Sequence, residues 1–246
     1  MAHNAETTSS MVDTSQPEGP DMSWASLYKA GGLSALLFVL LALVPIVLIF
    51  AAPVPPVAGD ALLAYIAANK IVYLTELVCF VGLSVPALLV FSALAVALKG
   101  MNKSRAAIGG LFGVASEVIA LALGSSPQSL HGGLVVLSDS YMAARTDAER
   151  AGLVSAADAL ISATNAVSWA GILTAAGILV LSLIMRRGYF GSVAGILGVV
   201  TGAAGIVSEA FRPMIGPAYL LYGLLLPSWF AIMGWKLLRL DRRRTS

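Results

Sequence analysis

Six long stretches of the chain are apolar and carry at most one charged residue each, and they constrain the fold more than any other feature. A helix needs about 20 consecutive apolar residues to cross the hydrocarbon core of a bilayer. Because each stretch is continuous and does not alternate with polar residues, barrel strands are excluded. We therefore predict an all-α fold, a polytopic membrane bundle with six transmembrane helices. The stretches lie at residues 30–52, 71–98, 106–127, 160–185, 189–210 and 216–238.

The composition agrees with a lipid-facing surface. The chain has 246 residues, of which 58% are hydrophobic and 11% charged, and its mean hydropathy is +0.87. A soluble domain carries about a quarter charged residues. A folded chain also keeps a large accessible surface, so this much apolar material cannot all be buried in one core. This excludes a cytosolic enzyme and a nucleic-acid-binding protein, and the single Cys79 excludes a disulfide-stapled scaffold.

The polar ends of the chain flank one membrane domain. Residues 1–24 begin with a polar, acidic run that contains no base up to position 22. A segment of this composition cannot bury enough apolar surface to fold, so we predict a disordered cytoplasmic tail. Residues 25–240 form the predicted six-span domain. Residues 241–246 form a basic C-terminal tail that can attract anionic lipid headgroups.

Two segments outside the predicted spans carry helix signals. Asp60 is placed to N-cap a short helix over residues 61–69. Thr146 and Glu149 form a T-x-x-E capping box, so a helix is expected to start there and run into the fourth span. From Asp147 to Met185 that helix would be about 58 Å long, which exceeds the bilayer thickness, so its first dozen residues should project from the membrane or bend along its surface.

The basic residues predict the orientation. With six spans, both termini share a side, and that side carries 11 of the 15 Lys and Arg residues. Loops rich in Lys and Arg stay in the cytoplasm, so we expect both termini to be cytoplasmic in a prokaryotic plasma membrane. Tyr73, Tyr219 and Tyr222 are expected in the aromatic belt of the outer interface. The 11 bases are Lys29, Lys99, Lys103, Arg105, Arg186, Arg187, Lys236, Arg239, Arg242, Arg243 and Arg244.

Three acids and one base lie within or next to the predicted spans. Ionisable groups are costly in hydrocarbon, so each is a candidate for function. Glu117 lies near the middle of the third span, and Glu76 lies about two turns inside the second. Glu209 lies near the end of the fifth span, and Arg212 follows on nearly the same helical face. The alternative for each acid is a structural role in pinning helices together.

Glycines mark the faces on which helices can approach closely. Gly110 and Gly113 share a face of the third span with Glu117. The glycine faces predict close helix packing, either within the chain or with a second copy or another membrane protein. The third and fifth spans also share a G-x-x-G-x-x-S-E pattern at an offset of 92 residues, which is compatible with a hairpin repeat or with coincidence. In the fifth span the stripe consists of Gly191, Gly195, Gly198, Gly202 and Gly205.

No catalytic, cofactor or metal motif is present in the sequence. There is no H-E-x-x-H and no GxxxxGK[ST]. The two histidines, His3 and His131, lie far apart and outside the predicted spans, so neither a His/Cys metal site nor an intramembrane Ser–His pair is encoded. We predict that the protein is not an enzyme and has no cofactor or nucleic-acid partner, with the bilayer as its environment and any small-molecule ligand unidentified.

Several segments resemble a known group of proteins. They are SDSYMAARTDAERAGLVSAADALISATNA, LIMRRGYFGSVAGILGVV and WFAIMGWKLLRL, with FGVASEVIA in the third span. The chain is similar over most of residues 25–240 to multipass membrane proteins of bacteria and archaea that are grouped only as a domain of unknown function. The resemblance implies about six helices and no particular reaction. In that group an Arg precedes the acid of the third span by three residues, whereas this chain has Val114 there.

Two hypotheses for function follow. The first is a non-catalytic membrane protein that binds or scaffolds a partner. The alternative is a small transporter that uses Glu117, with Glu76 and Glu209, as a proton or cation site. A cavity that reaches Glu117 would favour transport, whereas a solid bundle would favour a scaffold.

Overall fold

The computed structural model describes residues 19–48, 50, 52–123, 131–166, 169–186, 188–215 and 218–242, and no strand occurs among them. The predicted all-α class is confirmed. The helices, in chain order, are η1 (Met22–Trp24), α1 (Ala25–Leu48), α2 (Gly59–Ala68), α3 (Lys70–Gly82), α4 (Ser84–Leu98), α5 (Lys103–Leu123), α6 (Gly132–Ala143), α7 (Asp147–Ala166), α8 (Trp169–Met185), α9 (Ser192–Ala210), α10 (Arg212–Ile215) and α11 (Tyr219–Arg242).

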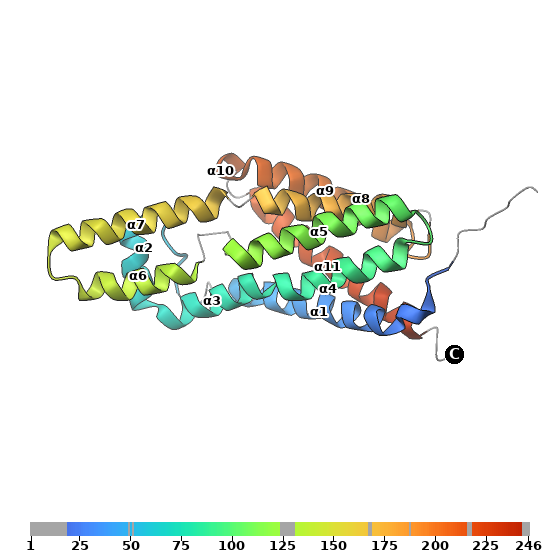
Figure 1. The fold of residues 1–246 in the computed structure, drawn as a ribbon, viewed down its shortest axis with the longest axis horizontal. Coiled ribbons are helices and arrows are strands. Elements are labelled where there is room, and N and C mark those ends of the chain that lie inside the picture. The colour runs from blue at the N-terminus through green and yellow to red at the C-terminus, as the bar shows by residue number, and fades with distance from the viewer. Residues whose placement is uncertain are drawn as a thin grey trace, which may run out of the picture.

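Six of these helices pack as a closed ring. The order of contact around it is α1, α4, α5, α8, α9 and α11, and α11 returns to α1. The order in space is therefore the order in the chain, although α2 and α3 come between α1 and α4, and α6 and α7 come between α5 and α8. Both ends of the described chain lie at one end of the ring, which we call the terminal end (Figure 1).

Five helices are long and apolar enough to cross a membrane, over Met22–Pro45, Lys70–Leu98, Lys103–Ala122, Ser192–Ala210 and Tyr219–Leu240. The sixth ring member, α8, is apolar but has only 17 residues. The predicted fourth span at 160–185 therefore differs from the structure, because residues 160–166 belong to α7. Ile161 of α7 is buried among residues of α2, α3 and α6, so apolar contact outside the ring explains the apolar start of that stretch.

The helices α2, α6 and α7 form a separate unit that we call the cap. It extends beyond the ring at the end opposite the termini, with α6 and α7 running side by side (Figure 1). Its core contains Leu62, Ile66, Leu134 and Ala157, together with Tyr73 from α3. The start of α7 lies beyond the ring, and its predicted place outside the membrane or along the membrane surface stays a prediction. Tyr73 is fully buried in the cap core, so it is not placed as an interfacial aromatic residue.

The helices α7 and α2 of the cap satisfy the free backbone N–H groups at their N-termini in two different ways. The predicted capping box is confirmed: Thr146 Oγ1 accepts from the Glu149 N–H at 3.2 Å, and Glu149 Oε2 accepts from the Thr146 N–H at 3.2 Å. The predicted N-cap at Asp60 is wrong, because α2 begins at Gly59 after Ala58 and has no side-chain cap. Instead the Gly59 N–H donates to Asp158 Oδ1 of α7 at 3.0 Å, so a tertiary contact replaces the local cap.

The half of the ring near the terminal end is filled by aromatic side chains. Phe38 of α1 stacks on Phe230 of α11, and Phe91 of α4 meets Phe230 and Trp229 at 6.2 and 6.3 Å between ring centroids. Trp229, Phe91 and Phe230 are fully buried. This layer closes the ring and separates the terminal end from the rest of its interior.

Glycines allow backbones to touch around α8. A Cβ added at Gly177 of α8 would lie 2.9 Å from both the Gly109 oxygen and the Gly113 nitrogen of α5. On the other side of α8, a Cβ added at Gly202 of α9 would lie 2.7 Å from the Ala175 oxygen and from the Leu179 nitrogen. Small residues that permit such contact are typical of packed membrane helices.

The predicted glycine faces are used within the chain. Gly110 and Gly113 of α5 face Ala95 and Phe91 of α4, while Gly195, Gly198 and Gly205 of α9 face α8 and α11. An oligomer would therefore need another surface. Gly191 differs from the rest of the stripe, because it precedes α9 with φ +84°, a conformation that favours glycine.

The predicted hairpin repeat is not reflected in helix register. Gly110 of α5 lies against Ala95 of α4, and its counterpart Gly202 of α9 lies against Ala175 and Leu179 of α8. If the two hairpins were related by the offset of 92 residues, the counterpart of Ala95 would be residue 187, and Gly202 would be expected to lie against that position. The two hairpins therefore close with different registers.

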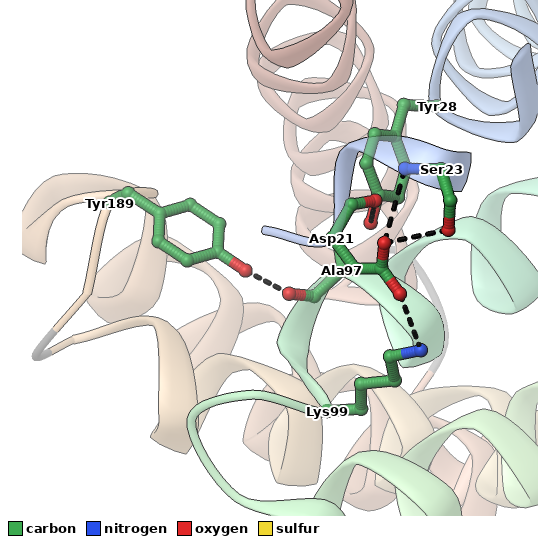
Figure 2. Close-up of polar contacts among 6 residues, drawn as sticks. All are labelled: Asp21, Ser23, Tyr28, Ala97, Lys99 and Tyr189. Carbon is green, nitrogen blue, oxygen red and sulfur yellow. Dashed lines mark hydrogen bonds and ion pairs between the residues drawn. The ribbon is translucent and has the colours of Figure 1, made fainter. Parts of the chain in front are cut away.

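Residues 19–24, predicted as part of a disordered tail, are ordered by contacts at the terminal end, and the tail prediction for residues 1–18 lies outside the described residues (Figure 2). Asp21 Oδ1 accepts from the Ser23 N–H at 3.1 Å and caps η1, while Asp21 Oδ2 lies 3.1 Å from Lys99 Nζ. The Tyr28 hydroxyl donates to the Asp21 carbonyl at 3.0 Å, and the Tyr189 hydroxyl donates to the Ala97 carbonyl. These contacts join the start of α1 to the end of α4 and the α8–α9 loop.

The first prediction concerns the contact between α5 and α8. Gly177→Ala should lower the free energy of unfolding by about 1–3 kcal/mol, since the new methyl group meets backbone atoms that cannot turn away. Gly223→Ala in α11 is the matched control, because nothing lies within 4 Å of its added Cβ. Denaturant titration of the purified protein in mixed micelles would measure both. Equal stability of the two variants would contradict the assigned contact.

The second prediction concerns how the stability of the protein depends on pH. Hydrogen bonds from Ser23 and the neighbouring Lys99 lower the pKa of Asp21 from 3.8 to about 2. The stabilisation by this charged carboxylate is therefore complete above about pH 4 and lost as the pH falls toward 2. The stability difference between the native chain and Asp21→Asn should shrink over that window in thermal unfolding scans. A difference that stays constant from pH 5 to pH 2 would refute this.

Candidate functional site

A cavity of about 330 Å³ lies in the half of the ring nearest the cap. Phe38 of the aromatic layer is among its lining residues, so the filled half of the ring ends where the cavity begins. Its wall is mainly apolar and contains a small set of polar groups, which is typical of ligand pockets. The polar lining residues are Ser84, Ser116, Glu117, Thr164, Thr174, Glu209, Arg212, Tyr219 and Tyr222.

The cavity reaches the outer surface of the ring at α11. Leu220 and Leu224 line it, yet they are 65% and 57% exposed. Gly223 also lines it, and the proline at position 227 has no N–H to donate to the Gly223 carbonyl. The first two turns of α11 thus supply both an apolar rim and a backbone acceptor. These residues fall within a stretch long and apolar enough to cross a membrane, so the opening faces the predicted lipid.

Glu117 of α5 is held by hydroxyl groups. It is 7% exposed, and the Thr174 hydroxyl of α8 donates to its Oε1 at 3.3 Å. Ser84 at the start of α4 is a second hydrogen-bond partner of this carboxyl group. Thr174 Oγ1 also lies 2.5 Å from Ser116 Oγ, which donates to the Ala170 carbonyl at 2.5 Å. None of the ion pairs in the described part of the chain involves Glu117.

Glu209 of α9 has a basic partner. The Tyr219 hydroxyl donates to its Oε1 at 2.7 Å, and Arg212 Nη2 donates to the Tyr219 oxygen at 3.2 Å. Oε2 lies 3.6 Å from Arg212 Nη1, which is an ion pair but too long for a hydrogen bond, and this oxygen has no hydrogen-bond partner. A Cβ added at Gly171 would lie 2.6 Å from the Glu209 Cδ atom, so the glycine makes room for the carboxyl group.

The structure brings three of the four predicted polar residues together. Glu117 and Glu209 approach the cavity from the two helices that flank α8, and Arg212 lines it beside Glu209. Glu76 does not line it: this side chain is buried in α3, and its Oε2 atom has no hydrogen-bond partner. Spacing along the chain placed Glu209 and Arg212 on one face, but only packing decides which acids share a cavity.

Sequence reasoning missed several polar groups at this site. The sequence does not single out Ser84, Ser116 or Thr174 as site residues. It predicts Tyr219 for an aromatic belt, whereas in the structure Tyr219 bridges Glu209 and Arg212. Hydropathy gives no signal for them, because Ser, Thr and Tyr are common in membrane helices. The described residues contain no group of three His, Cys, Asp or Glu side chains that could hold a metal ion.

Comparison with known proteins adds no family assignment. No family model, curated protein or solved structure matches this chain. The resemblance to multipass proteins of unknown function therefore stays a prediction.

The third prediction compares the contributions of a buried and an exposed ion pair to the free energy of unfolding. Arg212→Gln should lower the free energy of unfolding by about 3 kcal/mol, because Glu209 is left buried without its partner. The double variant Glu209→Gln/Arg212→Gln should recover most of that loss. Lys70→Gln is the control, since its pair with Asp139 is exposed and worth at most about 1 kcal/mol. A double variant as unstable as Arg212→Gln alone would contradict the pairing.

Proposed function

We propose that this chain is a non-catalytic, multipass protein of the prokaryotic plasma membrane, with both termini in the cytoplasm. We further propose that it binds a small, mainly apolar molecule that bears a protonated amine or another cationic group. The membrane location is supported by five helices long and apolar enough to cross a bilayer. The orientation is supported by the excess of Lys and Arg at the terminal end of the ring.

The observation that carries the proposal is the unequal pairing of the two acids in the cavity. Glu209 is neutralised by Arg212, whereas Glu117 has only hydroxyl partners among the described residues. A carboxyl group in an apolar cavity interacts strongly with a cation, since little water is present to screen the charge. The remaining lining is apolar, so the part of the ligand that bears no charge should be hydrocarbon or aromatic.

The position of the opening supports entry from the bilayer. The exposed Leu220 and Leu224 at the cavity rim lie on the outer surface of α11. A ligand that partitions into lipid can reach this rim without crossing an aqueous phase. An amine with an aromatic or short alkyl body has this property, and a cavity of about 330 Å³ accommodates such a molecule.

Transport is the second candidate function, and one observation favours it. The cavity reaches Glu117, which is the arrangement expected for a proton or cation site near the middle of a membrane helix. The aromatic layer of Phe38, Phe91, Trp229 and Phe230 closes the path to the terminal end. Transport would therefore need a second conformation in which this layer separates, whereas binding needs no such change.

The fourth prediction tests the charge on the ligand. N,N-dimethylbenzylammonium and its neutral isostere isobutylbenzene would be titrated against the protein in nanodiscs, with affinity read from thermal stabilisation. Glu117→Gln should weaken binding of the ammonium compound at least tenfold, about 1.4 kcal/mol, and leave isobutylbenzene unchanged. Glu76→Gln is the control, since it removes a buried acid outside the cavity, and it should change neither affinity.

Two outcomes would decide against these functions. If Glu117→Gln weakens both compounds equally, or neither, Glu117 does not recognise a cation and the proposed ligand class is wrong. If proteoliposomes with the native chain and with Glu117→Gln show the same proton-coupled uptake of the amine, the transport alternative is excluded.

A further inference from the structure

A second cavity, of about 580 Å³, lies at the terminal end of the ring between α5, α8 and α9. It is separate from the cavity near the cap, and the two share no lining residue. Its wall combines two arginines, two smaller polar residues and an apolar side. The lining residues used below are Asn102, Arg105, Leu183, Arg186, Ser192 and Ile196.

The positive charge of this cavity is unbalanced. Arg105 and Arg186 are exposed side chains, and neither forms an ion pair with a described acid. Asp21, a described carboxylate at the same end, is already paired with Lys99. Two arginines that line one cavity, with no ion pair to a described acid, make it a place where an anion is favoured.

The backbone adds to this positive potential. Arg105 lies in the first turn of α5, where the helix dipole disfavours a cation unless an anion is near. Ser192 begins α9, and Gly191 before it provides no side-chain cap for the free N–H groups. Arg186 is held close to α9 because Gly195 has no side chain: a Cβ there would lie 2.6 Å from the Arg186 Cγ atom.

The apolar side of the cavity favours a lipid over a soluble anion as its ligand. Leu183 lies three residues from Arg186 toward the middle of α8, and Ile196 lies four residues from Ser192 along α9. Both line the cavity, and they are 41% and 51% exposed. Exposed hydrocarbon in the same cavity as two arginines matches a molecule with a phosphate head and acyl chains. A soluble phosphate compound would leave this side uncovered.

We propose that the cavity between α5, α8 and α9 binds the phosphate headgroup of an anionic phospholipid, with Arg105 and Arg186 as its ligands. Acyl chains of the lipid lie along Leu183 and Ile196. Basic cavities between helices on the cytoplasmic side of a membrane are suited to such headgroups. The site rests on the proposed membrane orientation, but it is independent of the Glu117 cavity and its amine ligand.

The experiment compares two lipids that differ only in headgroup. Phosphatidylglycerol and phosphatidylcholine with the same acyl chains would be titrated against the full chain in detergent, and bound lipid counted by native mass spectrometry. The native chain should prefer phosphatidylglycerol. Arg105→Gln and Arg186→Gln should each weaken its binding about fivefold, and the double variant more than tenfold, with phosphatidylcholine unaffected.

Control variants keep the test specific. Arg239→Gln removes a base at the same end that instead stacks on Trp235, at 3.7 Å from the ring centroid, and it should bind phosphatidylglycerol as the native chain does. Arg105→Lys/Arg186→Lys retains the charge but loses bidentate contacts, so it should bind more tightly than the double glutamine variant. Thermal unfolding without added lipid establishes that each variant is folded.

Three results would overturn the proposal. In the first, the folded double glutamine variant retains native affinity for phosphatidylglycerol. In the second, Arg239→Gln loses as much affinity as Arg186→Gln, which would indicate diffuse attraction to a basic surface. In the third, glycerol 3-phosphate displaces phosphatidylglycerol at equal concentration, which would assign the site to a soluble phosphate compound. None of these results depends on whether an amine binds at Glu117.

Discussion

The close backbone contact of α8 with α5 and α9 determines where the polar residues of the ring lie. Gly177 meets the backbone of α5, and Gly202 brings α9 against the other side of α8. Even a methyl group at either position would push these helices apart. Because the contact is so close, Thr174 reaches Glu117 on one side, and Gly171 accommodates Glu209 on the other. Both acids therefore face one cavity.

The interior of the ring is packed with side chains in one half and contains a cavity in the other. Large aromatic side chains fill the half near the terminal end, and small and polar ones surround a cavity in the half near the cap. A filled half gives rigidity, since close-packed interiors resist displacement. The open half then provides a fixed space with fixed acceptors. The bundle is therefore not solid throughout, and a cavity reaches Glu117, a point that the sequence alone left open.

Particular residues show how far the sequence could predict the fold and the site. The ring helices, the capping box at Thr146 and Glu149, and the helical face shared by Glu209 and Arg212 follow from local rules of length, capping and periodicity. The N-cap at Asp60 failed because a residue 99 positions away, Asp158, satisfies the Gly59 amide. Glu76 and Glu117 are both acids inside predicted spans, and only Glu117 lines the cavity.

By itself, the sequence determined that the chain is helical, that long stretches of it are apolar, and that 11 of its 15 bases fall on one side of the predicted spans. These properties depend on neighbours along the chain, since hydropathy and charge act over a few turns of helix. The tertiary structure alone decided that α7 packs with α2 and α6 to form a cap, and that Ser84, Thr174 and Tyr219 lie with the two acids around one cavity. Those outcomes depend on which faces meet, and that is fixed by the fit of small residues between helices distant in sequence.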